Sequence, residues 1–287
     1  MTQDLVLQRL LSFAKSDENV RTVLLEGSRA NPDAKVDEFS DYDIAFVTRS
    51  NQSYLSKEWF LSFFSQFGKI VISQMPDNPN LFLDAHDPLE HYAYLVQFSS
   101  GLRLDITLET VKFIQKVPLD SAAVVLLDKD ENFFDIEPNN SDFYVKRPKK
   151  NEFLACCNEF WWTSLYIAKA LKRKQIIGAL ELMNTTIRLE FVKMLTWLAG
   201  VENNFADDVG KYNTDIGKYI SKDFYHALIS SYSCAKLSAV NNAFISLLKN
   251  FPQISQIVAN SLSFNYDLQE GEKTLKFLKE YYGVSLD

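Results

Sequence analysis

Hydrophobic and polar residues follow two different patterns along this chain, and the change between them divides it into two halves. In the first half, apolar positions at helical spacing predict helices over residues 4–16 and 53–67. Short apolar runs rich in β-branched residues predict strands over residues 20–26, 41–47, 70–73, 92–98, 102–108 and 124–127. The second half has helical spacing throughout, which predicts helices over residues 152–174, 175–198, 222–236, 239–250 and 267–282.

A polar segment with two prolines separates these halves between residues 135 and 151. The order of elements before it favours a mixed β-sheet flanked by helices, and the order after it favours a bundle of about five helices. We therefore expect an α+β protein with one domain over residues 1–145 and an all-α domain over residues 146–287. Gly68 is expected to end the second helix, and Gly200 is expected to end the helix over residues 175–198.

Composition narrows the class of protein. The chain has 287 residues, 47% of them hydrophobic, which is typical of a globular protein with room for two cores. Its net charge of −7 disfavours nucleic acid as the main partner and suits a cationic small molecule better. Three cysteines, two of them adjacent, suggest no disulfide framework and fit a reducing compartment. The sequence shows no signal peptide and no run as long as a membrane span, so we expect a cytoplasmic protein.

The candidate chemistry begins where the first strand ends at Gly27 and Ser28. Glycine allows a sharp turn and a close ligand, and a serine with nearby backbone N–H groups can face a phosphate. The second strand then opens with Asp41 and Asp43, whose i, i+2 spacing places both carboxylates on one face. Two carboxylates that close repel each other and favour a hard cation such as Mg²⁺. The Gly-Ser turn and the aspartate pair each also have an ordinary interpretation, because Gly-Ser is a common turn and Asp-x-Asp also starts solvated strands.

A third acid, Asp105, lies in the middle of the strand over residues 102–108. It has two interpretations: a group on a solvated face or paired with Arg103, or a third carboxylate that completes the metal site. With Asp41 and Asp43 it would form a set that suits two-metal phosphoryl or nucleotidyl transfer. One ion would activate an acceptor hydroxyl, and the other would bind the triphosphate and the leaving pyrophosphate.

Other classes of enzyme lack their motifs. The three histidines, His86, His91 and His226, form no HExxH motif or Cys/His cluster, which disfavours a zinc site. Ser28 is not in a G-x-S-x-G elbow, which disfavours acyl transfer. The chain has no P-loop motif and no G-x-G-x-x-G motif, so neither nucleotide-binding fold is expected.

The same stretches carry a family resemblance. LEGSRANP at 25–32, DYDI at 41–44 and RLDITL at 103–108 resemble the DNA polymerase β-type nucleotidyltransferase superfamily. More specifically, the chain is similar to the aminoglycoside 6-adenylyltransferases, the streptomycin-modifying group. This resemblance covers nearly the whole length, through VLLDKD at 125–130, KRP at 146–148, CCNEFW at 156–161, YIAKAL at 166–171 and VGK at 209–211. The chain departs from the group over residues 73–91 and after Lys211, where the group tends to carry a second lysine.

The resemblance implies a nucleotidyltransferase domain, a helical substrate-binding domain, and Mg²⁺-dependent transfer of AMP from ATP to an aminoglycoside hydroxyl, with release of pyrophosphate and antibiotic resistance. It implies two Mg²⁺ ions held by Asp41 and Asp43, with Asp105 as a further metal ligand or as the base for the acceptor hydroxyl. It further implies that the triphosphate is held by Gly27, Ser28, Arg29 and Lys211. Arg29 has a structural alternative, a pairing with Glu26 or Asp41.

A polycationic acceptor calls for acids and an aromatic edge. The candidates are Glu159, Trp162 and Glu181, on the first two helices of the second half, in a site expected between the domains. Each also has an ordinary interpretation, Trp162 as a core residue and the two acids as solvated groups. Two other functions stay open: a same-fold nucleotidyltransferase acting on another hydroxyl, such as that of a lincosamide or a protein, and a non-catalytic nucleotide-binding module.

Overall fold

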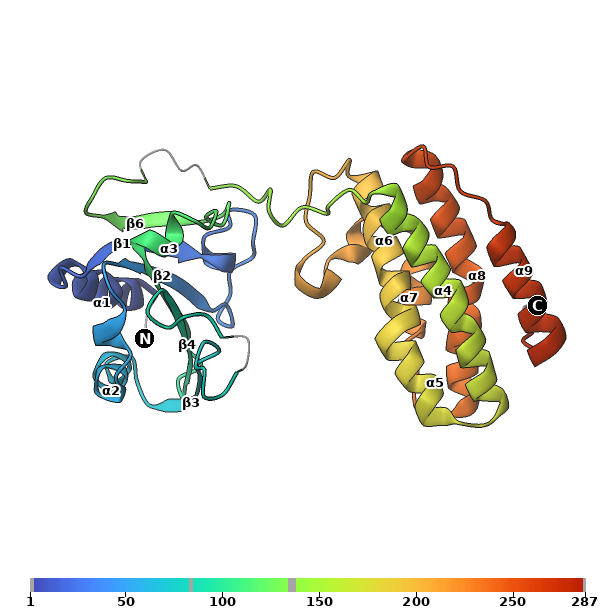
Figure 1. Ribbon diagram of the computed structural model, residues 1–287, viewed down its shortest axis with the longest axis horizontal. Helices are drawn as coiled ribbons and strands as arrows, with labels where there is room; N and C mark the ends of the chain where they lie inside the picture. The colour runs from blue at the N-terminus through green and yellow to red at the C-terminus, as the bar shows by residue number, and fades with distance from the viewer. Residues whose placement is uncertain (1–2, 83–84, 134–137, 286–287) are drawn as a thin grey trace. The chain divides into compact units, whose positions relative to one another are not determined.

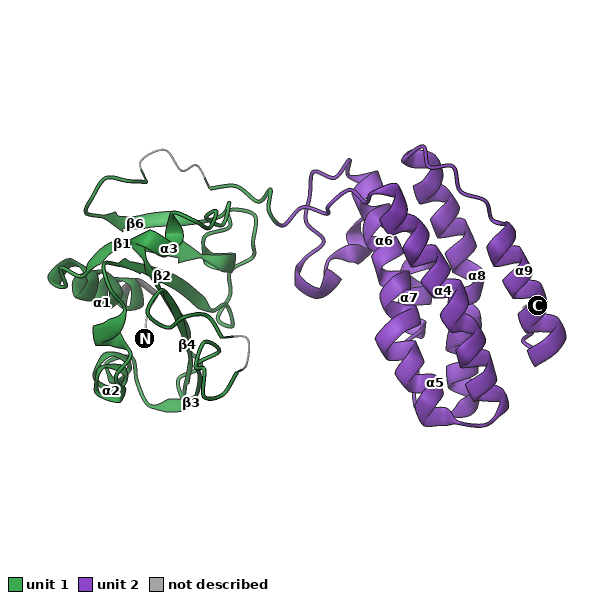
Figure 2. Ribbon diagram, in the orientation of Figure 1, with its two compact units in different colours: residues 1–142 green, residues 143–287 purple. Residues whose placement is uncertain are grey.

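The computed structural model describes residues 3–82, 85–133 and 138–285, and the chain divides into two compact units (Figure 2). Unit 1 is Met1–Asp142 and unit 2 is Phe143–Asp287. Unit 1 contains a mixed sheet with helices and unit 2 is helical, so the predicted α+β fold is confirmed. In the part of the chain that the structure describes, no helix combines the length and the apolar character needed to cross a membrane.

Within the described residues, the sheet of unit 1 has six strands in the order β3-β4-β5-β2-β1-β6. The neighbours β2 and β5 run parallel, and the other neighbouring pairs run antiparallel. A parallel pair in the middle of the sheet needs a crossover, and β3 and β4 lie within that connection. The strands are β1 Val20–Glu26, β2 Tyr42–Thr48, β3 Ile70–Gln74, β4 His91–Phe98, β5 Arg103–Thr110 and β6 Val124–Asp128.

Two helices cover one face of the sheet and a short third helix lies on the other (Figure 1). Helices α1 Gln3–Ser16 and α2 Lys57–Ser65 pack with one set of alternating strand residues, such as Ile44 and Ile106. Helix α3 Val111–Ile114 packs with the opposite set, such as Ala45 and Val47. Alternation along each strand therefore decides which side chains face α3, and the acids discussed below belong to that set.

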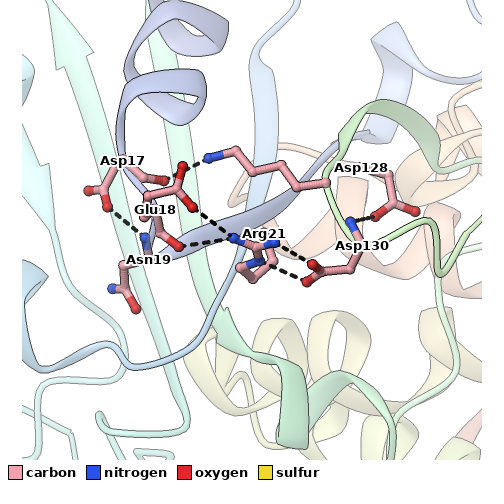
Figure 3. A network of polar contacts seen from close by, with 7 residues as sticks. Asp17, Glu18, Asn19, Arg21, Asp128 and Asp130 are labelled. Carbon is pink, nitrogen blue, oxygen red and sulfur yellow. Dashed lines mark hydrogen bonds and ion pairs between the residues drawn. The ribbon is translucent and has the colours of Figure 1, made fainter.

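A polar network fixes the beginning of β1 against the end of β6 (Figure 3). Arg21, largely buried, donates hydrogen bonds to Asp130 and to Glu18. Lys129 donates from Nζ to the carbonyl of Asp17 at 2.9 Å. The contacts of Arg21 with Asp130 and of Lys129 with Asp17 join residues more than a hundred positions apart in the chain, so they hold the last strand of the sheet in place.

Unit 2 consists of α4 Lys150–Lys172, α5 Ile176–Leu182, α6 Arg188–Glu202, α7 Lys222–Ser230, α8 Leu237–Ser261 and α9 Gln269–Phe277. A π-helical segment, Met183–Ile187, joins α5 and α6, so the predicted helix over residues 175–198 is interrupted in its hydrogen-bond pattern. The core is aromatic at its centre, where the rings of Phe160 and Phe251 stack with centroids 3.6 Å apart.

Several helix ends differ from the prediction. Helix α7 ends at Ser230, where we expected an end at residue 236, and α2 begins at Lys57, where we expected a start at residue 53. Helix α6 continues past Gly200 to Glu202. The glycine serves close packing and does not end the helix: a Cβ there would stand 2.6 Å from the ring of Phe205. Helix α8 continues past Pro252 to Ser261, where we expected an end near residue 250. Proline removes one donor and favours a helix end, but Phe251, Ile254 and Val258 are fully buried on one face. Burial of that apolar face outweighs the local preference.

Candidate active site

Three acidic residues stand side by side on neighbouring strands of unit 1. Asp43 of β2 pairs in register with Glu26 of β1 on one side and with Asp105 of β5 on the other. Their chain neighbours Leu25, Ile44 and Ile106 belong to the core under α1 and α2. The three acids therefore point to the opposite face of the sheet, the face that carries α3.

Gly27 brings the backbone directly against this row of acids. It begins the short 3₁₀ turn Gly27–Arg29 that follows β1, and its φ is +64°. A Cβ on Gly27 would stand 2.2 Å from Oδ2 of Asp43, which no real side chain tolerates. The turn and the carboxylate that the sequence linked are therefore in contact, and Ser28 is exposed beside them.

Arg103 pairs with two carboxylates of this site. Its guanidinium donates to both oxygens of Asp105, at 3.1 and 2.7 Å, and its Nη1 lies 3.3 Å from Oδ2 of Asp41. The pKa of Arg103 is raised, mainly by the hydrogen bond to Asp105 and then by the charges of Asp105, Asp41 and Asp43. Of the two interpretations of Asp105, the structure shows the pairing with Arg103. It also brings Asp41 to the same guanidinium and places Asp43 beside Asp105 on the neighbouring strand.

Arg29 fixes the approach to β2. It donates from Nε to the carbonyl of Asp41 at 2.9 Å and from Nη2 to the carbonyl of Ser40 at 2.8 Å. Its guanidinium carbon lies 4.0 Å from the centre of the Tyr42 ring. The remaining nitrogen, Nη1, is buried and has no hydrogen-bond acceptor among the described residues. Of the alternatives considered for Arg29, the structure shows contact with the main chain of Asp41.

Glu26 is a member of this site that the sequence argument did not include. Burial, the largest cause, and then the charges of Glu109, Asp120 and Asp43 together raise its pKa to about 7. Glu109, on the same face of β5, also has a raised pKa because it is buried. The available signal was the acid at the end of an apolar strand, directly before Gly27, where a charged group needs a reason to be buried.

Unit 2 contains a cavity of about 710 Å³ beside the start of α4, formed entirely by residues of that unit. Glu159 is one of its residues, and Oε1 of Glu159 accepts a hydrogen bond from the Thr163 hydroxyl at 3.1 Å. The wall is rich in both signs of charge. It is lined by Lys146, Arg147, Pro148, Lys149, Glu152, Ala155, Cys156, Glu159, Glu190, Lys193 and Trp197.

The three acids of this cavity differ in their partners. Glu190 pairs with Lys193 at 2.7 Å, and Glu152 accepts from the backbone N–H of Lys149 at the start of α4. Glu159 contacts a neutral hydroxyl and carries no cationic partner within the described residues. It is therefore the acid of the cavity best able to receive an added positive charge.

The other predicted residues of unit 2 are exposed. Trp162 on α4 is 56% exposed and lies edge-on to Tyr166, so it is not a core residue. Glu181 on α5 is exposed and does not line the cavity. Lys211 is exposed, with its Nζ 5.7 Å from the Tyr212 ring centre. The structure thus brings the unit 1 candidates together, and in unit 2 only Glu159 belongs to the cavity.

Comparison with known proteins gives one consistent group. A family model described as streptomycin adenylyltransferase matches residues 1–281. An aminoglycoside 6-adenylyltransferase of Campylobacter jejuni is 31% identical over 97% of this chain and 96% of its own length. Proteins of the same name from Staphylococcus aureus and Bacillus subtilis are each 31% identical, over 93% and 91% of this chain and 99% and 92% of their own. A crystal structure of an aminoglycoside 6-adenyltransferase from Bacillus subtilis is 28% identical, covers 96% of this chain and 97% of its own, and has a TM-score of 0.47.

Proposed function

Because the chain belongs to the streptomycin adenylyltransferase family and is a nucleotidyltransferase, we propose that it transfers AMP from ATP to a hydroxyl of a streptomycin-type aminoglycoside. One observation carries the chemical part of this proposal: Asp41 and Asp105 both contact the Arg103 guanidinium, and Asp43, which pairs in register with Asp105, lies against the Gly27 turn. The names of the relatives carry the choice of acceptor.

The donor set fits Mg²⁺. The ion prefers carboxylate oxygens, and the site offers two carboxylates that contact Arg103 and a third, Asp43, paired in register with Asp105. We assign Asp41 and Asp43 as ligands of two Mg²⁺ ions, with Asp105 as a further ligand or as the base. Bound Mg²⁺ would supply charge neutralisation and would lower the pKa of the acceptor hydroxyl.

The residues of unit 1 then have separate tasks. The acceptor oxygen attacks the α-phosphorus of ATP, the new O–P bond forms, the bond from the α-phosphorus to the bridging oxygen breaks, and pyrophosphate leaves. In the role of base, Asp105 takes the proton of the acceptor hydroxyl. Arg103, which holds Asp105 and Asp41, keeps these carboxylates in place and adds positive charge where negative charge develops.

The nucleotide contacts follow from the turn after β1. Gly27 allows a phosphate to approach the backbone, and the exposed Ser28 offers its hydroxyl. Arg29 has one buried nitrogen without an acceptor among the described residues, and a phosphate oxygen would satisfy it. Lys211 of unit 2 contributes a further positive charge to the triphosphate.

For the acceptor we propose the unit 2 residues Glu159, Trp162 and Glu181. Glu159 has the strongest support, because it lines a cavity of about 710 Å³ and has no cationic partner among the described residues. The exposed ring of Trp162 is available for a cation–π contact with a guanidinium or ammonium group of the drug. We propose the all-α unit as the substrate-binding domain and the sheet unit as the nucleotidyltransferase domain.

The test is an assay of pyrophosphate release from ATP in the presence of Mg²⁺ and streptomycin, with the adenylylated product identified by its mass. We expect release that depends on both the drug and the metal. Absence of release with streptomycin and with every other aminoglycoside would refute the acceptor. In that case a screen with labelled ATP against lincosamides and proteins would test the alternative, another hydroxyl acceptor on the same fold.

A second experiment tests resistance. A susceptible bacterium that expresses the wild-type chain should tolerate more streptomycin than one that expresses Asp43→Asn. Equal tolerance of the two strains would contradict a role in resistance, even if the purified protein were active. A purified protein that binds ATP but releases no pyrophosphate with any acceptor would instead favour a non-catalytic nucleotide-binding module.

A further inference from the structure

A second group of potential metal ligands lies in unit 1, apart from the carboxylates described above. Asp77, His86 and His91 each direct a ligand atom into one small region, with these atoms within 4.8 Å of one another. Asp77 and His86 lie between β3 and β4, and His91 is the first residue of β4. In the chain they are separated by nine and five positions, which corresponds to no common zinc motif.

The Asp77 carboxylate is buried and held in a fixed orientation. Its side chain is 8% exposed, and Oδ2 accepts the backbone N–H of Ala93 at 3.0 Å. The other oxygen, Oδ1, lies 2.8 Å from Nδ1 of His86. One oxygen is thus anchored to the sheet, which leaves the second to face the histidines. Anchoring of this kind is typical of carboxylates that bind metals.

The two histidine rings are also positioned by neighbours. The His91 ring stacks on Phe113 of α3, with centroids 5.1 Å apart and planes 16° apart, and the His86 ring lies edge-on to His91 at 4.5 Å. Nδ1 of His91 is buried and has no hydrogen-bond partner among the described residues. Burial, the largest influence on His91, lowers its pKa and so favours the neutral ring, the form that binds a cation.

We propose that Asp77, His86 and His91 bind one divalent transition-metal ion of the Zn²⁺ type. Two imidazoles and one carboxylate are a donor set that such ions prefer over Mg²⁺. Ligand atoms around a tetrahedral ion stand about 3.3 Å apart, given bonds of about 2.0–2.1 Å, and the observed group needs only small side-chain movements to reach this. His86 is 57% exposed, so an ion can reach the site from solvent. The fourth position is left for water or another ligand.

This site is distinct from the proposed Mg²⁺ site. His91 pairs in register with Glu109, four positions further along β5 than Asp105. Four residues of a strand span about 13 Å, so one ion cannot be shared by both groups. A bound ion would tie the segment before β4 to the sheet on the face that carries the catalytic carboxylates. The competing explanation is a plain ion pair between Asp77 and His86, without an ion.

The experiment is a titration of the full-length, chelator-treated protein with Zn²⁺ by calorimetry, and with Co²⁺ by the visible absorption of the bound ion. We expect one Zn²⁺ per chain that a large excess of Mg²⁺ does not displace. His91→Ala and His86→Gln should each weaken Zn²⁺ binding by more than about 100-fold, because loss of an outer-shell partner alone costs 10–100-fold. His86→Gln changes an exposed side chain, so it keeps the test valid if His91→Ala does not fold.

Two matched controls separate the site from other possible ligands. His226→Ala removes the third histidine, which lies on α7 of unit 2, and should leave Zn²⁺ affinity unchanged. Asp43→Asn should also leave Zn²⁺ affinity unchanged, and it separates this proposal from the proposed function. Zn²⁺ binding that is absent in the wild type, or that is equal in the wild type and His86→Gln, would overturn the proposal and leave the Asp77–His86 ion pair as the explanation.

Discussion

Gly27 and Asp43 are in direct contact: a Cβ added to Gly27 would stand 2.2 Å from Oδ2 and 2.9 Å from Cγ of Asp43. The backbone that is proposed to face the triphosphate therefore lies against a carboxylate that is proposed to hold the metal. Any side chain at position 27 must displace one of the two.

Gly27→Ala is expected to lower turnover by at least about 100-fold, because a shift of the Asp43 carboxylate by about an ångström disturbs metal and phosphate together. Pyrophosphate release at saturating ATP and streptomycin measures this. Gly101→Ala is the matched control, since Gly101 also has a positive φ, +89°, but nothing lies within 4 Å of its added Cβ. Both variants should lose about 1 kcal/mol of stability from backbone strain. Equal activity of the two variants would show that the contact with Asp43 has no role.

Asp43→Asn is expected to lower turnover by about 1,000-fold or more, because it removes a metal ligand worth several kcal/mol in the transition state. The fold should survive, because the change removes a negative charge beside Glu26. That charge opposes ionisation of Glu26 and so raises its pKa. Thermal unfolding checks this second point. Glu58→Gln, which removes an exposed acid on α2, serves as control and should keep full activity. Wild-type turnover in Asp43→Asn would refute the assignment.

Arg103→Met is expected to destabilise the metal-free protein and to increase the stabilisation that Mn²⁺ gives. Arg103 is the cation that now contacts Asp41 and Asp105, and its removal leaves their charges to repel each other until a metal binds. Unfolding temperature with and without Mn²⁺ measures both effects. An unchanged Mn²⁺-dependent shift would mean that Arg103 does not compete with the metal for these carboxylates.

Glu26 is expected to make stability depend on pH. Burial, and then the charges of Glu109, Asp120 and Asp43, raises its folded-state pKa to about 7, above its usual value near 4.5. Between these two pH values the unfolded chain releases its proton while the folded chain keeps it, so stability falls as pH rises from about 4.5 to about 7.

The variant Glu26→Gln is expected to remove this loss of stability with rising pH. We expect it to be more stable than the wild type at pH 8, by a difference of the order of 1 to 3 kcal/mol, and equally stable at pH 4.5 or below. Urea unfolding at several pH values gives the comparison. Glu109 keeps the burial that raises its pKa in both proteins, so the difference reports Glu26 together with its charge interaction with Glu109. If the difference in stability between Glu26→Gln and the wild type is the same at all pH values, it comes from altered packing and not from ionisation of Glu26.

The sequence predicted the strands that carry Asp43 and Asp105 because apolar runs and i, i+2 spacing are local patterns. It could not predict that these two residues pair in register, since β2 and β5 are distant in the chain and meet only in the folded sheet. The same holds for Asp77, His86 and His91, whose ligand atoms converge although their spacing matches no motif. Gly200 shows the converse: a local rule predicted a helix end, and packing against Phe205 explains the glycine.

Two of the residues proposed to bind the acceptor, Glu159 and Glu181, lie in the same unit, so the effects of their substitution can be compared. Glu159 lines the unit 2 cavity and has no cationic partner among the described residues, whereas Glu181 lies on α5 and does not line it. If the drug binds in this cavity, Glu159→Gln should raise KM for streptomycin about tenfold, the loss of roughly one charge-assisted hydrogen bond, and leave KM for ATP unchanged. Glu181→Gln should raise KM for streptomycin by less.

A larger rise in KM for streptomycin in Glu181→Gln than in Glu159→Gln would contradict this ranking. It would move the acceptor away from the cavity at the start of α4 and toward the exposed face of α5. Trp162→Leu distinguishes these positions further, because it removes an exposed ring from α4 without changing charge. A rise in KM for streptomycin in Trp162→Leu that accompanies the rise in Glu159→Gln would place the cationic drug along α4, since a cation–π contact and an ion pair then act on the same ligand.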